Sequence, residues 1–132
     1  MHQIIAKGAA TMAVLISPAL TAVEIGLHCR NPDLEIRCFE GSCDSSDDFT
    51  PMHVVINTDN SMSICAYSGC WEGPSEYFSS GTFEAFFAHQ LSFLPMKSAS
   101  MNADFAVVFD YADEMAIVKG FGFAMPMQCE PL

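Results

Sequence analysis

The sequence predicts a single all-β domain, a small antiparallel β-barrel or β-sandwich of about eight strands that is stabilised by disulfide bonds. Three observations lead to this fold class. Short stretches of alternating apolar and polar residues recur between turn-forming residues. The chain begins with a segment typical of a secretory signal peptide. All six cysteines follow that segment, and an even number of cysteines in a secreted domain predicts disulfides.

Residues 1–22 have the order of a signal peptide. A short basic region precedes an uncharged apolar run from Gly8 to Leu20, and Ala22 ends a small-residue cleavage site. The run is shorter than the ~20 residues that a membrane-spanning helix needs, although an uncleaved N-terminal anchor is the alternative. We therefore expect a mature domain over 23–132 that is secreted or periplasmic.

Turn residues divide the mature chain into short strands. The predicted strands cover 23–29, 34–39, 52–57, 61–67, 77–81, 103–109, 114–119 and 121–129. The turns at 58–61 and 110–113 each join two strands in an antiparallel hairpin. Residues 41–48 are predicted to be a polar loop. Pro126 indicates an edge strand or a break in the last strand, because proline cannot donate a backbone hydrogen bond.

Residues 82–94 are ambiguous. Phe83, Phe86 and Leu91 belong to a set at helical spacing, and Pro95 would end such a helix. At a period of two, Phe83 and Phe87 instead share a face with His89. The neighbouring segments are hairpin-linked strands that need partners, so we predict a strand here, with one short helix around 82–94 as the alternative.

Two pairs of cysteines have the same short spacing, and each pair is expected to clip a tight turn. The remaining two cysteines would then tie the first strand to the last. The predicted disulfides are Cys29–Cys129, Cys38–Cys43 and Cys65–Cys70. A zinc site is the alternative, but the histidine spacing of such sites does not accompany these cysteines, and we predict neither a metal nor another cofactor.

The composition is strongly acidic. The mature chain carries 16 Asp and Glu but only four of the five Lys and Arg residues, a formal net charge of −12. A surface of this sign repels the phosphates of nucleic acids and the anionic surfaces of membranes. It attracts cationic proteins or peptides, and these are the partners that the composition favours.

The turn after the fourth strand carries the candidate binding residues. If Cys65 and Cys70 pair, the Ser-Gly turn between them becomes a rigid knuckle that presents aromatic side chains, which are common at binding hot spots. The predicted binding residues are Tyr67, Ser68, Trp71 and Glu72. The alternative is that Trp71 belongs to the core, as most tryptophans do.

Catalytic motifs are absent from the sequence: there is no G-x-S-x-G, no phosphate-binding glycine loop and no paired metal-ligand histidines. We therefore expect a binding protein without catalytic activity, in one version an inhibitor of a cationic secreted enzyme such as a lysozyme or protease. Two alternatives stay open. One is a barrel that holds a small apolar ligand, and the other is a metal or hydrolytic site built on His28, His53 and His89.

Overall fold

The computed structural model describes residues 8–14 and 26–132. Its elements are β1 (Leu27–Arg30), β2 (Glu35–Phe39), β3 (Ser42–Ser46), β4 (His53–Ile56), β5 (Met62–Ala66), β6 (Gly69–Gly73), β7 (Glu76–Ser80), β8 (Phe83–Leu94), the 3-10 helix η1 (Ala99–Met101), β9 (Ala103–Asp110), β10 (Met115–Gly120) and β11 (Phe123–Pro131). The signal peptide predicted for 1–22 lies outside the described residues except for 8–14, which form no helix or strand.

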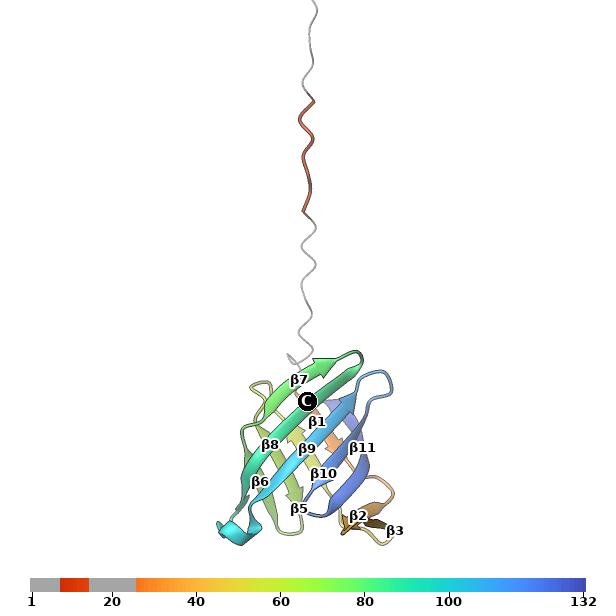
Figure 1. The fold of residues 1–132 in the computed structure, drawn as a ribbon, viewed down its shortest axis with the longest axis vertical. Helices are drawn as coiled ribbons and strands as arrows, with labels where there is room; N and C mark the ends of the chain where they lie inside the picture. Colours follow the sequence, from red (N-terminus) through yellow and green to blue (C-terminus); the bar gives the residue numbers. More distant parts are fainter. Residues whose placement is uncertain (1–7, 15–25) are drawn as a thin grey trace, which may run out of the picture.

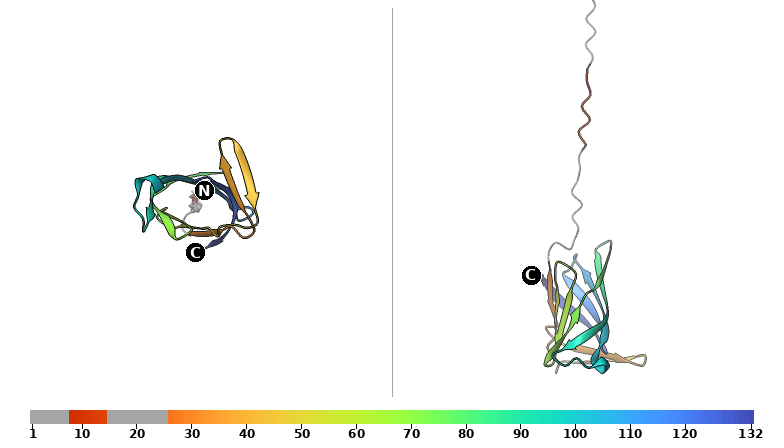
Figure 2. Two further views of the ribbon diagram at one scale, coloured as in Figure 1. Left: turned by 90° about the horizontal axis from the view of Figure 1, so that it is seen from below. Right: turned by 90° about the vertical axis from the view of Figure 1, so that its left-hand side faces the viewer.

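Eight strands close into an antiparallel barrel, in the order β1, β4, β5, β6, β8, β9, β10 and β11 (Figure 1). The last strand returns to the first, with Cys29 directly opposite Cys129, and the two cysteines form a disulfide at this seam. The view along the barrel shows the closed ring of strands (Figure 2). The predicted all-β fold class is confirmed, and of its two forms the barrel is the one observed.

Three strands lie outside this ring. β7 continues the direction of β6 after Pro74 and pairs with the first half of β8, whereas β6 pairs with its second half. The β2–β3 hairpin joins β11 through Arg37 opposite Phe123 and projects from one end of the barrel (Figure 1). The loop predicted over 41–48 is therefore wrong in part. Cys38–Cys43 staples a hairpin here, and the backbone pairing overrides the polar composition.

The ambiguous segment 82–94 is a strand, and the helical alternative is wrong. β8 pairs with β9 along one side and with β6 and β7 along the other. Hydrogen bonds to these three strands satisfy the backbone groups of β8, and they outweigh the helical preference of some of its residues. No helix in the described ranges is long and apolar enough to cross a membrane.

The barrel interior is packed with large apolar side chains. Alternation along each strand directs one set inward, as the sequence predicts for Met62, Ile64 and Ala66 of β5. The largest fully buried side chains are Trp71, Phe86, Phe123, Met52, Ile56, Met62, Ile64, Leu91, Met125, Met127, Val54 and Val107. Burial of these residues is the main favourable term in folding.

The six cysteines pair as predicted, in the disulfides Cys29–Cys129, Cys38–Cys43 and Cys65–Cys70. Three disulfides indicate an oxidising compartment.

Pro126 lies where β11 changes partner from β2 at Phe123 to β1 at Gln128. No strand of the described residues pairs with this edge of β11 at Pro126, so the missing N–H of proline costs no hydrogen bond there.

The seam disulfide should contribute most of the covalent stabilisation, because it closes a loop of 100 residues whereas Cys38–Cys43 spans five. We expect the double substitution Cys29→Ala/Cys129→Ala to lower the free energy of unfolding by about 2–5 kcal/mol. The matched control, Cys38→Ala/Cys43→Ala, should cost clearly less. Urea denaturation of the three proteins measures both, and equal losses would contradict this assignment.

Candidate functional site

The four residues predicted to bind a partner separate into two groups. Tyr67 is 58% exposed, and Ser68 and Glu72 are also exposed. Trp71 has no exposed surface. Its ring packs in the interior against Phe93, Phe105 and Phe121, and its Nε1–H donates a hydrogen bond to the Met101 carbonyl oxygen at 2.7 Å. Trp71 thus matches the core alternative, and a binding role for the other three stays a prediction.

The turn closed by the Cys65–Cys70 disulfide, which we call the stapled turn, packs against β2 and β8. The guanidinium of Arg37 lies 5.8 Å from the centre of the Tyr67 ring and 4.4 Å from that of Phe123. Arg37 also forms an ion pair with Glu35. At Gly69, a Cβ would lie 2.3 Å from the Leu94 carbonyl oxygen, so only glycine fits where β6 meets β8. Tyr67 therefore lies beside a cation, which makes this turn a poor attractor for a cationic partner.

The basic residues are unevenly distributed along the barrel axis, whereas acidic residues occur at both ends. Strand direction places the turns 57–61, 81–82 and 111–114 at one end and the β2–β3 hairpin at the other. Five acidic residues that reach solvent lie at or near the first end: Asp59, Asp110, Asp113, Glu114 and Glu130. We call this set the acidic end. The Lys and Arg residues of the described ranges, Arg30, Arg37, Lys97 and Lys119, all lie toward the opposite end.

A β-bulge in β8 shapes the outer wall of the barrel. The register between β8 and β9 shifts between Ala88 and Leu91, and Gln90 has a φ of +51°. Before the bulge Phe86 and Ala88 point inward, and after it Leu91 and Phe93 do so. Strict alternation would have left Leu91 and Phe93 on the outside with Phe87. The bulge thus lets one long strand supply the core at both ends.

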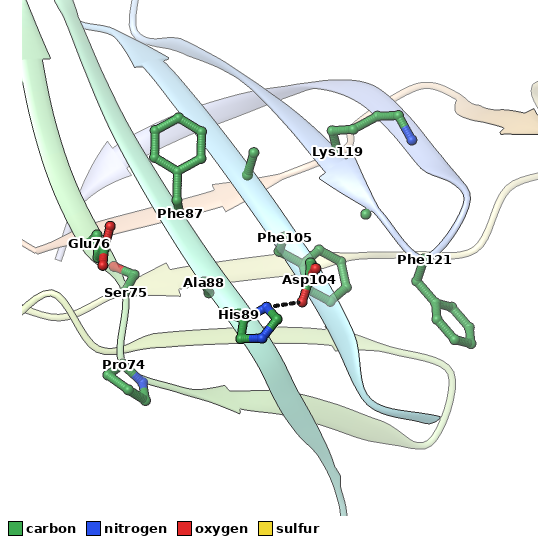
Figure 3. Close-up of a pocket in the computed structure, with 12 residues that line it drawn as sticks. Pro74, Ser75, Glu76, Phe87, Ala88, His89, Asp104, Phe105, Lys119 and Phe121 are labelled. Atoms are coloured by element: carbon green, nitrogen blue, oxygen red, sulfur yellow. Dashed lines mark ion pairs between the residues drawn. The ribbon is translucent and has the colours of Figure 1, made fainter. Parts of the chain in front are cut away.

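Asp104 of β9 holds the bulge in place. Its Oδ1 accepts the backbone N–H of Gln90 at 2.7 Å and lies 2.9 Å from Nδ1 of His89 (Figure 3). The Gln90 amide is the main cause that lowers the pKa of the Asp104 carboxyl below its ordinary value of 3.8, and His89 adds to the effect. The ionised carboxylate is therefore the form that stabilises the bulge.

Around this bulge lies an open groove of about 900 Å³ on the outside of the barrel (Figure 3). Its floor is apolar, with Phe87, Ala106 and Phe121 among the lining residues, and charged groups of both signs border it, including Glu76, His89, Asp104 and Lys119. Such a surface can bind the side chains of a partner. Ser75 also lines the groove, but its hydroxyl donates to the Asn60 carbonyl oxygen at 2.6 Å.

Glu84 is an acid inside the barrel wall. It is only 3% exposed, and its one hydrogen bond is accepted from the Tyr77 hydroxyl at 3.4 Å. Burial raises the pKa of the Glu84 carboxyl above 4.5, and the Tyr77 hydroxyl opposes this in part. The same burial raises the pKa of Tyr77. The sequence does not mark Glu84, because its inward position depends on the register of β8.

The three histidines do not converge. His28 Nε2 lies 3.1 Å from His53 Nδ1, and Glu130 lies 3.5 Å from the other nitrogen of His28. The rings are 11° from parallel with centres 5.3 Å apart, so they lie side by side with two nitrogens facing. This geometry suits a hydrogen bond, and His89 lies elsewhere, on Asp104.

No group of three or more His, Cys, Asp or Glu side chains within 8–14 and 26–132 is arranged to hold a metal ion. No protein-family model matches the chain, and no similar curated protein or solved structure is found.

The groove and the acidic end were not found from the sequence. The acidic end could have been found by assigning each acid to a turn and alternating the turns between the two ends of an up-and-down arrangement. The groove depends on the bulge at Gln90, and no residue there signals a bulge, since glutamine rarely adopts a positive φ.

Glu84→Gln should stabilise the protein at neutral pH. Folding raises the pKa of the Glu84 carboxyl above the value near 4.5 that it has in the unfolded chain. The protein therefore loses stability as the pH rises from the unfolded pKa to the folded pKa. Glutamine removes this cost and keeps an oxygen that can accept from Tyr77, so we expect a gain on the order of 1 kcal/mol at pH 7. The two proteins should converge below pH 4. Urea denaturation across pH tests this, with the exposed Glu76→Gln as control, and no gain at pH 7 would contradict it.

Asp104→Ala should loosen the bulge. The backbone N–H of Gln90 loses its acceptor, so its protection from hydrogen exchange should fall, whereas Asp44→Ala should leave it unchanged. In the wild type, protection should also fall as pH drops below the ordinary range of aspartate, because the pKa of Asp104 is lowered and its stabilisation is lost on protonation. Unchanged Gln90 protection in the variant would show that Asp104 does not hold the bulge.

Proposed function

We propose that the protein is a small secreted or periplasmic binding protein, without catalytic activity, that binds cationic proteins. Its specific form would be inhibition of a basic secreted enzyme such as a lysozyme or protease. The observation that carries the proposal is the acidic end, where five acids gather and the bases of the described ranges do not. The signal-peptide pattern and the three disulfides support a location outside the cytoplasm.

Segregation of charge supports binding better than net charge alone. Acids spread evenly would serve solubility, and an acidic end opposite a mixed end gives the molecule a directional field. Such a field orients a cationic partner during the encounter and raises its association rate. At physiological salt the field reaches about 8 Å, so the acids must lie together to act together.

The packed interior disfavours the alternative of an apolar ligand held inside the barrel. Twelve large side chains in the interior are fully buried, and Trp71 is the largest of them. The groove of about 900 Å³ instead lies on the outer wall, open to a partner. The histidine alternative is supported by no more than one close pair, His28 and His53.

Neutralising the acidic end should weaken binding more than neutralising the hairpin. Asp110→Asn/Asp113→Asn/Glu114→Gln keeps the oxygens that accept the turn's hydrogen bonds from Ala112 and Met115. With lysozyme and trypsin as probes, we expect this variant to lose association rate by about tenfold or more at low salt. The control Asp44→Asn/Asp47→Asn/Asp48→Asn removes as many charges from the other end and should have a much smaller effect.

Stopped-flow or surface plasmon resonance at several salt concentrations measures these rates, and enzyme assays measure inhibition. Wild-type binding to at least one probe should weaken steeply with salt. Absence of binding to both probes, or equal losses in the two triple variants, would contradict the proposed function.

A further inference from the structure

The outer face of one barrel wall carries an apolar row that crosses five strands. Strand pairing places one residue from each of β7, β8, β9, β10 and β11 side by side, all on the outside. The row is Phe78, Ala85, Val108, Ile117 and Pro126. Its two largest members, Phe78 and Ile117, are 56% and 61% exposed.

The rows on either side extend this surface. Phe83 and Met115 belong to the row nearer the acidic end, and Phe87, Ala106 and Ala124 to the row nearer the groove. Phe83 and Phe87 are each about half exposed, and the rings of Phe78 and Phe87 are in edge contact at 5.9 Å. We call these ten residues the apolar wall. Phe87 and Ala106 also line the groove, so the two surfaces are continuous.

The opposite side of the barrel is different. Outward positions on β1, β4, β5 and β6 are mostly polar or held in a disulfide: His28, Arg30, His53, Val55, Ser63, Cys65, Cys70 and Glu72. Val55 is the one aliphatic residue among them. The solvated face of an antiparallel sheet is ordinarily polar, so the His28 side follows the rule and the apolar wall departs from it.

Contiguous exposed apolar surface of this kind marks an interaction site. No segment within 8–14 and 26–132 covers it, because its phenylalanines and Ile117 remain about half exposed or more. The charges around it define the partner. Glu76 and Asp110 lie within the same rows, Asp113 and Glu114 follow at the adjoining turn, and Lys119 is the one base among them.

We propose that the apolar wall is the docking surface for a cationic protein segment that carries apolar side chains. This inference rests on the proposed function and names its contact surface and the chemistry of its partner. The apolar side chains would pack on Phe78, Phe87 and Ile117, and the basic groups would meet the acids that frame them. A second copy of this chain would bring like charges together, and anionic lipid surfaces would be repelled for the same reason.

Two peptides of equal charge test the surface. One alternates Lys with Leu, and in the other Ser replaces each Leu. The Lys–Leu peptide should bind about tenfold more tightly than the Lys–Ser peptide, because only leucine fills the apolar wall. Phe78→Ser/Ile117→Ser should remove most of this difference and leave the weak, salt-dependent Lys–Ser binding unchanged. Both positions are more than half exposed, so the fold should survive, which circular dichroism verifies.

The control variant is Val55→Ser on the polar side of the barrel, which should keep the preference for Lys–Leu. Equal binding of both peptides to the wild type, with salt dependence intact, would overturn the docking surface but leave the proposed function standing. Binding of neither peptide would contradict both. A wild-type dimer that Phe78→Ser/Ile117→Ser dissociates in sedimentation, or Ile117-dependent binding to phosphatidylcholine vesicles, would assign the wall to another occupant and overturn the proposal.

Discussion

The hydrogen bond from the Gln90 amide to the Asp104 carboxylate supports most of what is distinctive in this barrel. It fixes a bulge in β8, the longest strand, and the bulge reverses which face of the strand points inward. Leu91 and Phe93 are thereby buried, and Phe93 packs on Trp71. Before the bulge the odd-numbered residues, including Phe87, lie on the outside. The bulge that this contact holds thus decides which residues of the second half of β8 pack around the single tryptophan.

The closed barrel then divides its surface in two directions. Along the axis, the end formed by the turns 57–61, 81–82 and 111–114 carries acids without bases, whereas the end with the hairpin carries both. Around the axis, an apolar wall lies opposite a polar one. Long-range charge and short-range apolar contact act at different stages of binding: the first governs how fast a partner arrives, and the second governs how long it stays. A rigid, disulfide-stapled frame presents both without a large ordering cost.

Alternation and cysteine number sufficed to predict most of the strands, the fold class and the three disulfides, because alternating burial is a local pattern and the paired cysteines lie close in sequence or near the ends of the domain. The strands β3 and β6 were not predicted. These patterns did not suffice where tertiary pairing decides. The polar residues of β3 give no strand pattern and are held by Cys38–Cys43. Trp71 is placed by its aromatic neighbours and the Met101 carbonyl, which no spacing reveals. The row containing Phe78 and Ile117 exists only through the registers of five strands, so it could not be predicted from the sequence.

In the proposed mode of binding, a cationic partner meets the wall formed by β7 to β11. Backbone amide exchange of the protein, measured with and without saturating lysozyme or trypsin, whichever binds, tests this most directly. We expect protection to rise in 83–87, 106–110 and 115–119 and to stay unchanged in 65–70 and in the β2–β3 hairpin. Protection confined to the turn at Tyr67 and Ser68, with no change on β8 to β10, would contradict the account and restore the stapled turn as the binding site.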